Sequence, residues 1–407
     1  MPNTFTEKTS QSWFSRIGGS FAGAIAGIVM MLVAFPLLWW NEGRAVRTTR
    51  GLTEGAGAVV SIAADSVDAS REGALVHVSG LATTTDTPRD EQFGVAAPAL
   101  TLVRSVEMFQ WREEKKSEKR KKLGGGEETT TIYTYKTGWS GTAIDSAGFR
   151  HPDGHHNPGR FPWESTTIVA DRVTLGAFAL PRDLVATIGA PEPLRLDASG
   201  AGQTATASGV RVVDGGFYRG SNPDDPAVGD VRIRFEVVRP QVVSVVAVQK
   251  GNSFEAYRTK AGTTILMLER GAVAADTMFE AAESSNRVTA WILRAVGVFL
   301  MFLGLFLLFR PIAVVGSVVP MLGSLVAGGI GFAAFFVALA LSLVTISLAW
   351  LAYRPMLAIG LLGAAAAGVA LVIRRRRVKR PSTGAAPPPL PPASTARTLP
   401  PPLPPAS

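Results

Sequence analysis

The sequence of 407 residues contains no cysteine. This absence excludes disulfide bonds, thiolate metal sites and a cysteine nucleophile. The sequence also lacks the short motifs of hydrolase elbows, phosphate-binding loops and dinucleotide-binding folds. We therefore predict that the protein is not an enzyme, has no catalytic residue and needs no cofactor.

Charge is absent from residues 17–40. As a helix this stretch would extend about 36 Å, enough to cross a hydrocarbon core of about 30 Å. It ends in bulky side chains, Trp39 and Trp40 among them, rather than in the small residues of a signal-peptide cleavage site. We predict a retained transmembrane helix at 17–40.

Charge is also scarce from Val288 to Ile373, where Arg294, Arg310 and Arg354 are the only charged residues. All three lie near the ends of the apolar segments, where an arginine can reach the headgroups. The predicted elements of this block are transmembrane helices at 289–309, 324–350 and 356–373, with 310–323 as an interfacial or reentrant connection.

The number of spans depends on the uncharged stretch 311–353. It is long enough for two spans only if they are joined by a very tight hairpin, and Pro320 with several glycines weakens its first half as a straight helix. We therefore predict one span there and four in all. A count of five is the alternative.

Orientation follows from a cluster of basic residues directly after the last predicted span. Under the positive-inside rule this cluster places the C-terminus in the cytoplasm, and its side chains are also suited to anionic lipid headgroups. With four spans, residues 1–16 are cytoplasmic and residues 41–288 form an extracytoplasmic domain, whereas five spans would place that domain in the cytoplasm. The cluster consists of Arg374, Arg375, Arg376, Arg377, Lys379 and Arg380.

The central region has the patterning of strands. Residues 231–237 alternate apolar and charged side chains, and residues 242–248 form a nearly continuous β-branched run. Further short candidates lie at 75–78, 106–111, 131–135, 168–175, 210–213 and 264–268. We predict an α+β membrane protein whose four transmembrane helices, one N-terminal and three C-terminal, flank a β-rich domain of small barrels or sandwiches with one or two cores.

Seven separated stretches, in order, resemble signatures of the transmembrane protein 43 (LUMA) family. They are Leu38–Val46, Leu75–Gly80, Val106–Trp111, Gly154–Pro158, Val228–Arg232, Thr259–Gly262 and Tyr353–Pro355. The resemblance implies four spans, a large lumenal or extracytoplasmic domain and no established enzymatic activity. Animal members of the family are inner nuclear membrane proteins associated with envelope organisation, and bacterial members are linked to membrane stress or defence. The heavy basic cluster and a proline-rich tail depart from the family pattern.

Two of these stretches are predicted to lie at the membrane interface. The first, at the exit from the first span, comprises Trp39, Trp40, Asn41, Glu42, Gly43 and Arg44. In it the tryptophans set the depth, Asn41 and Gly43 suit the backbone of a helix exit, and Glu42 and Arg44 can pair with each other or with headgroups. The turn ends the helix, docks the β domain or carries a protein contact. The second stretch, Tyr353, Arg354 and Pro355, is a turn between two helices.

Two loops contain residue types that can bind metal ions. His151, His155 and His156 lie near Asp153, but Pro152 and Gly154 would break the helix that brings such histidines together. Asp224, Asp225 and Asp230 lack the regular alternation of a calcium loop. We predict a structured loop and a turn, with no metal site.

Two polar segments are predicted to be solvated. The basic run 112–122 is interpreted as a long hairpin loop, with binding of anionic lipid or nucleic acid as the alternative. The tail 374–407 combines the basic cluster with proline runs, and we predict a disordered cytoplasmic spacer that proline-recognising modules can bind.

Together these features predict a noncatalytic membrane scaffold or envelope-organising protein. Its partners are membrane lipids and proteins bound by the β domain, a homo-oligomer is compatible with the sequence, and nucleic acid is not expected. The predicted location is the bacterial inner membrane with a periplasmic domain, or the endoplasmic reticulum or inner nuclear membrane if the source is eukaryotic. A transport or channel component and a ligand-binding or enzymatic β domain are the alternatives.

Overall fold

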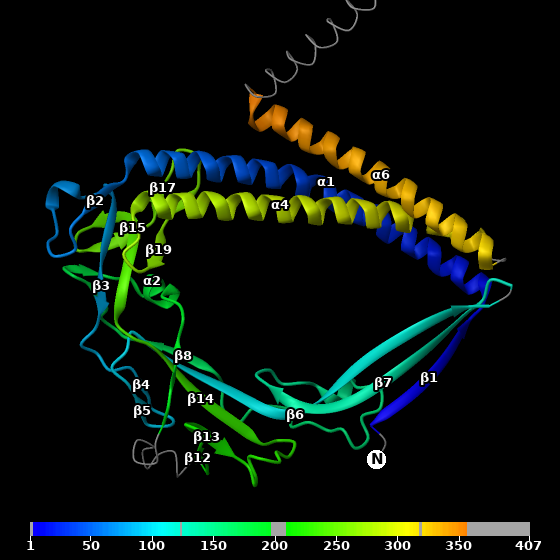
Figure 1. Ribbon diagram of the computed structural model, residues 1–407. Helices are drawn as coiled ribbons and strands as arrows, with labels where there is room; N and C mark the ends of the chain where they lie inside the picture. The colour runs from blue at the N-terminus through cyan, green and yellow to red at the C-terminus, as the bar shows by residue number, and fades with distance from the viewer. Residues whose placement is uncertain (1–2, 123, 197–208, 317–319, 356–407) are drawn as a thin grey trace, which may run out of the picture. The chain divides into compact units, whose positions relative to one another are not determined.

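The fold combines long helices with a β-rich region, in a computed structural model that describes residues 3–122, 124–196, 209–316 and 320–355 (Figure 1). The predicted span 356–373, the basic cluster 374–380 and the proline-rich tail lie outside these residues. The described part confirms the α+β class and the β-rich centre between apolar helices.

Three helices in the described part of the chain are long and apolar enough to cross a membrane. They are α1 Trp13–Ala58, α4 Ala275–Leu308 and α6 Pro320–Tyr353. The short helix α5, Arg310–Val315, lies in the predicted connection 310–323. Three of the four predicted spans therefore correspond to helices in the described part of the chain, and the fourth stays a prediction because it lies outside the described residues.

The predicted helix exit at residues 41–44 is wrong. α1 continues through it for 46 residues in total and ends at Ala58, with Val59 as its C-cap. Residues 41–58 include neither proline nor a left-handed glycine. Nothing in this stretch therefore ends the helix at Trp40, where the apolar side chains end. The uncharged segment therefore marks the part of α1 suited to the bilayer, and not the limits of the helix.

Glycines allow α1 and α4 to approach closely along their apolar parts. A Cβ atom on Gly27 would lie 2.5 Å from the Gly304 carbonyl oxygen, and one on Gly297 would lie 2.4 Å from the Leu38 side chain. Small residues at such points bring two helix backbones into van der Waals contact, which is a main source of helix association in lipid. The α1–α4 pair is therefore defined by Gly27, Gly297 and Gly304.

Gly27→Ala is expected to destabilise the protein by about 1–3 kcal/mol, because the added methyl group overpacks the α1–α4 contact. Gly18→Ala is the matched control, since a Cβ atom at Gly18 meets nothing within 4 Å and the gain in helix propensity is the same. Thermal unfolding in detergent measures both. Equal midpoints for the two variants would contradict this packing.

The β-rich region contains two principal sheets. In the eight-stranded sheet the order is β1-β7-β6-β14-β13-β12, with β11 on β14 and β8 on β6. Its strands are β1 Thr4–Gln11, β6 Thr101–Lys121, β7 Glu127–Ser140, β8 Thr166–Val169, β11 Glu192–Leu194, β12 Arg211–Val213, β13 Gly216–Arg219 and β14 Val231–Val238. The sheet is open, with β1 and β12 at its two edges.

The seven-stranded sheet has the order β10-β9-β3-β15-β16, with β19 on β15 and β2 on β3. The sheet curls so that its end strands β10 and β16 meet. There the Ala179 amide donates to the Asn252 carbonyl at 2.7 Å, and Ser253 Oγ donates to the Ala179 carbonyl at 3.0 Å. This half is therefore barrel-like. Its strands are β2 Val60–Ile62, β3 Leu75–Thr83, β9 Thr174–Leu175, β10 Phe178–Ala179, β15 Gln241–Lys250, β16 Ser253–Glu255 and β19 Met267–Arg270.

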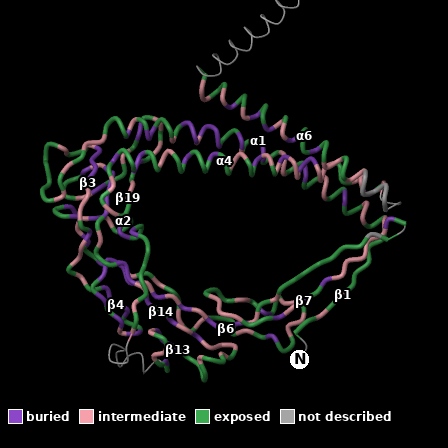
Figure 2. The backbone as a smooth tube through the Cα atoms, viewed as in Figure 1, coloured by how far each residue is buried: buried purple, intermediate pink, exposed green. Residues whose placement is uncertain are grey.

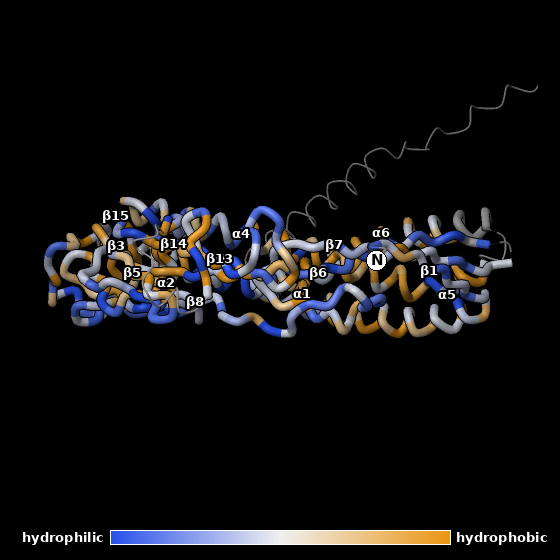
Figure 3. Tube along the Cα trace, turned by 90° about the horizontal axis from the view of Figure 1, so that it is seen from below, coloured by the Kyte–Doolittle hydropathy of each residue, from blue (hydrophilic) through white to orange (hydrophobic). Residues whose placement is uncertain are grey.

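Each principal sheet has its own hydrophobic core. Val243, Val245 and Phe178 belong to the core of the barrel-like sheet, which the short helix α2 Arg182–Thr187 covers on one side. Phe93 and Phe235 belong to the core of the open sheet. Figure 2 shows buried positions along β3 and β14, and Figure 3 shows apolar turns along the helices against mixed colouring in the β region. Among the described residues the two principal sheets thus have separate cores, one of the two arrangements that the sequence allows.

The basic run 112–122 is not a loop. β6 continues to Lys121 and pairs with β7 in antiparallel register, from Met108 opposite Ser140 to Lys121 opposite Glu127. Charged residues on β6 face mainly threonines and acidic residues on β7, and such cross-strand pairs stabilise a strand that has no apolar face. Two small ladders complete the β structure, β4 Arg89–Asp90 with β5 Val95–Ala96, and β17 Tyr257–Arg258 with β18 Thr264–Ile265.

Strand β1, which the sequence analysis did not predict, joins the N-terminus to the β region. It pairs with β7 from Thr4 opposite Thr134 to Gln11 opposite Glu127. Past its end, the Arg16 side chain donates to the Gly125 carbonyl and Trp13 Nε1 donates to the Val314 carbonyl at 3.0 Å. The tip of the β6–β7 hairpin therefore contacts the beginning of α1.

Candidate functional site

The first of the two stretches predicted to lie at the interface forms a polar cluster with residues of α4 and α6. Glu42 is completely buried, and both of its oxygens accept hydrogen bonds from Arg294 on α4, from Nε at 2.6 Å and from Nη2 at 2.9 Å. Trp350 Nε1 on α6 donates to the same carboxylate at 2.8 Å. One carboxylate therefore joins three helices.

Neighbouring side chains extend this contact between α1 and α4. Asn41 donates to the Ala290 carbonyl at 3.0 Å, Arg44 donates to Asn286 Oδ1 at 3.0 Å, and Asn286 donates to the Ala45 carbonyl at 3.1 Å. These bonds satisfy polar groups that would be costly to bury in an apolar bundle. We call the set Asn41, Glu42, Arg44, Asn286, Arg294 and Trp350 the interhelical cluster.

Gly43 and Tyr353 connect the two predicted stretches directly. A Cβ atom on Gly43 would lie 2.7 Å from the Tyr353 ring, so only glycine leaves room for the tyrosine. The Tyr353 ring also lies 5.9 Å from the Trp39 ring, and Arg50 donates to the Tyr353 carbonyl at 2.8 Å. α6 therefore ends against α1 at Tyr353, and the predicted turn at residues 353–355 stays a prediction.

The structure changes the roles assigned to several charged residues. Glu42 pairs with Arg294, not with Arg44 or with headgroups, and Arg294 points into the helix bundle where the sequence analysis expected it to reach the headgroups. Positions 286, 290 and 294 recur every four residues on α4, and this spacing, which places Asn286 and Arg294 on one side of the helix, is a sequence signal of the shared face. Trp39 and Trp40 are 39% and 51% exposed, and their position at the membrane interface stays a prediction.

The β region docks on the extension of α1 beyond the apolar part. Glu54 accepts hydrogen bonds from the Lys260 amide at 2.9 Å and from the Tyr257 hydroxyl at 3.0 Å. The hydrogen bond to Glu54 raises the pKa of Tyr257. A Cβ atom on Gly51 would clash with Thr263, so the loop packs closely on the helix. The stretch 259–262 thus holds the β domain on α1, a role first assigned to residues 41–44.

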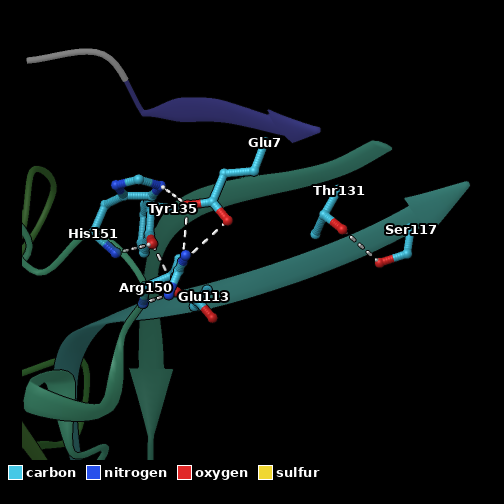
Figure 4. Close-up of polar contacts among 7 residues, drawn as sticks. All are labelled: Glu7, Glu113, Ser117, Thr131, Tyr135, Arg150 and His151. Atoms are coloured by element: carbon cyan, nitrogen blue, oxygen red, sulfur yellow. Dashed lines mark hydrogen bonds and ion pairs between the residues drawn. The ribbon is translucent and has the colours of Figure 1, made fainter. Parts of the chain in front are cut away.

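A second polar cluster links β1, β6 and β7 with the loop that contains the histidines (Figure 4). Tyr135 donates to Glu113 at 2.6 Å and accepts from the His151 amide at 2.9 Å. Glu7 on β1 accepts from Arg150 at 2.8 Å and lies 3.3 Å from His151 Nε2. The hydrogen bond from Arg150 lowers the pKa of Glu7. These contacts fix the loop on the sheet.

His155 and Asp230, from the two loops considered for metal binding, also have structural contacts. His155 is buried, stacks on Tyr135 with ring centroids 4.1 Å apart and contacts the His151 carbonyl through Nδ1. Asp230 accepts from Tyr218 at 2.6 Å and from the Ala227 amide at 2.9 Å, which closes a turn. Within the described ranges, no group of three or more metal-ligand side chains is present.

Tyr135 makes the second cluster sensitive to alkaline pH. Burial, with the hydrogen bond to Glu113, raises the pKa of Tyr135 to about 12, above the value near 10 of an unfolded chain. The stability that this shift contributes is complete below pH 10 and is lost as the pH rises towards 12. We expect the thermal midpoint of the wild type to fall more steeply over this interval than that of Tyr135→Phe. Parallel curves would contradict the assignment.

Comparisons of the sequence with known proteins relate the chain to one family. The family model described as transmembrane protein 43 matches residues 108–355, which include α4, α6 and most of the β region. The chain is 35% identical to rat transmembrane protein 43 over 364 residues, covering 86% of this chain and 89% of the relative. It is 34% identical to the human protein over 373 residues, covering 88% and 92%.

A more distant relative from an insect is described as a homolog of the same protein. The Drosophila melanogaster transmembrane protein 43 homolog is 28% identical over 284 residues, covering 69% of this chain and 74% of the relative. No solved structure matches the chain. The match to the family model and the identity to the mammalian proteins over most of their length show that the chain belongs to the transmembrane protein 43 family.

Proposed function

We propose that this multi-pass membrane protein is a noncatalytic scaffold whose extracytoplasmic β domain is presented to protein partners at a fixed position relative to the membrane. The observation that carries the proposal is the continuity of α1. This helix passes without a break from its apolar part, through the interhelical cluster, to the Glu54 contacts with the β domain.

α4 supports the proposal from the other end of the β domain. It begins at Ala275, five residues after β19 ends at Arg270, and reaches the cluster through Asn286 and Arg294. Met278 and Phe279 on its first turns pack with Leu52 of α1 and Val246 of β15 in one buried cluster. Two helices therefore leave the β domain side by side, and neither is joined to it by a long linker.

An exposed apolar pair on the barrel-like sheet is a candidate partner contact. Leu81 on β3 lies directly opposite Val242 on β15, and the two side chains are 53% and 41% exposed. Cross-strand neighbours of this kind form one small apolar surface. We propose this pair as part of the surface that contacts proteins in membrane stress or envelope organisation.

Site-specific photocrosslinking in living cells tests the proposal. A benzophenone amino acid at position 81 is expected to give discrete high-molecular-weight adducts. The same probe at Thr167, an exposed polar position on β8 of the open sheet, serves as the control. The proposal fails if position 81 yields no adduct beyond those at position 167. Ion flux through vesicles that contain the purified protein would favour the transport alternative instead.

A further inference from the structure

An apolar groove lies between α1 and α6, next to the interhelical cluster. Its volume is about 560 Å³, and it has an almost entirely apolar lining. Phe35, Trp39 and Trp40 line it from α1, and Leu341, Val344 and Leu348 line it from α6. Several of these side chains are among the exposed apolar residues of the described chain, including Trp40 at 51% and Val344 at 56%.

Two arginines lie on the same face of α1 as the groove. Positions 36, 40, 43, 47 and 50 recur at intervals of three or four residues, so Arg47 and Arg50 continue the groove face beyond Trp40. Both arginines are exposed. Side chains on a helix tilt towards its N-terminus, and for Arg47 and Arg50 this direction is back towards the groove.

The contact of Arg50 confirms this direction. Its guanidinium donates to the Tyr353 carbonyl at 2.8 Å, and the Tyr353 ring lies 5.9 Å from Trp39 in the groove wall. Positive charge therefore lies at the end of the groove where the aromatic residues mark the membrane interface. An anionic headgroup above an acyl chain has the same order of charged and apolar parts.

We propose that the groove binds one acyl chain of an anionic phospholipid whose phosphate is held by Arg47 and Arg50. Basic side chains near a membrane surface favour anionic lipid, and two of them beside a groove select one lipid from the layer that surrounds the helices. The site is separate from the proposed protein contacts of the β domain, so either proposal can fail without the other.

Native mass spectrometry of the purified full-length protein tests the site. The protein is equilibrated with equal amounts of phosphatidylglycerol and phosphatidylcholine in detergent. We expect selective retention of one phosphatidylglycerol, with an apparent affinity reduced on the order of tenfold or more in the double variant Arg47→Gln, Arg50→Gln. Val344→Trp, which fills the groove and leaves both arginines in place, is expected to reduce retention as well.

Arg287→Gln is the matched control. Arg287 is exposed on α4, and its neighbour Asn286 donates to the Ala45 carbonyl, so Arg287 lies at a similar level along the helices and away from the groove. The site is supported if Arg287→Gln retains phosphatidylglycerol while the double arginine variant and Val344→Trp lose it. The site would be overturned if the wild type retained the two lipids equally. It would also be overturned if the double arginine variant bound phosphatidylglycerol as the wild type does, or if Arg287→Gln lost as much binding as the double variant. If Val344→Trp retained phosphatidylglycerol as the wild type does, the groove would not be the site of the acyl chain.

Discussion

Replacing Glu42 with glutamine is expected to destabilise the packing of α1, α4 and α6 by about 3–5 kcal/mol, because it leaves the Arg294 guanidinium buried without its counter-charge. The side chain of Arg294 is only 16% exposed, so water cannot replace the carboxylate. Arg294→Gln should have a similar effect, since it leaves Glu42 as an uncompensated buried charge. Loss of either the Glu42 or the Arg294 charge would disorder the end of α6 at Trp350.

Intrinsic tryptophan fluorescence during thermal unfolding measures this effect, because Trp350 donates directly to Glu42. The double variant Glu42→Gln, Arg294→Gln removes both charges and is expected to recover part of the loss. Glu280→Gln, which removes an exposed carboxylate from the same helix α4, is the control and should leave the midpoint nearly unchanged. Equal midpoints for Glu42→Gln and Glu280→Gln would contradict the role of the cluster.

Replacing Asp90 with alanine is expected to cost a similar amount in the β domain, about 3–5 kcal/mol. Asp90 and Arg104 are 2% and 8% exposed and are joined at 2.7 Å, and Asp90 Oδ1 also accepts from the Gln92 and Phe93 amides. The variant removes the counter-charge of Arg104 and a cap of the turn that positions Phe93 in its core.

Asp68→Ala provides the comparison for Asp90→Ala. Asp68 also caps a short turn and pairs with Arg71, but their side chains are 50% and 43% exposed. Exposed ion pairs contribute at most about 1 kcal/mol, so its variant should unfold close to the wild type. A loss of stability in Asp68→Ala as large as that in Asp90→Ala would show that burial does not set the difference.

The long helices and the longest strands apart from β1 could be predicted from the sequence because both depend on local patterns. The absence of charge at 17–40 indicates a helix that crosses a membrane, and alternation at 231–237 indicates β14. The boundaries of α1 could not be predicted in this way, since residues 41–58 are helical for reasons of packing against α4 and the β domain. β1 was missed because Thr4–Gln11 has no clear apolar face.

The interhelical cluster could be predicted only in part. The residues from Asn41 to Arg44 and Tyr353 stood out by their likeness to the family, but their partners did not. Glu42 and Arg294 are 252 positions apart in the sequence, and no local pattern connects residues at that separation. Arg294 near the end of an apolar segment has the sequence features of a residue that reaches the headgroups, and only the packing of three helices shows otherwise.

The pairing of β1 with β7 sets a condition on the predicted topology. If residues 17–40 cross the bilayer once, residues 4–11 and the β domain lie on opposite sides. Hydrocarbon does not tolerate the charged side chains and open edges of these strands, so the two features coexist in one chain only if β6 and β7 pass the bilayer through an aqueous space. Thr9 and Thr129 are opposite one another, and a disulfide between Thr9→Cys and Thr129→Cys in membranes would show the pairing in the inserted protein.

The most direct test of the account is the side of the membrane on which the β domain lies. The chain has no cysteine, so Asn252→Cys, at an exposed turn between β15 and β16, provides a single thiol. Intact cells, permeable only at any outer membrane, are treated with a membrane-impermeant maleimide. We expect labelling without lysis. Protection that disappears on lysis would place the β domain in the cytoplasm and contradict the proposed extracytoplasmic scaffold.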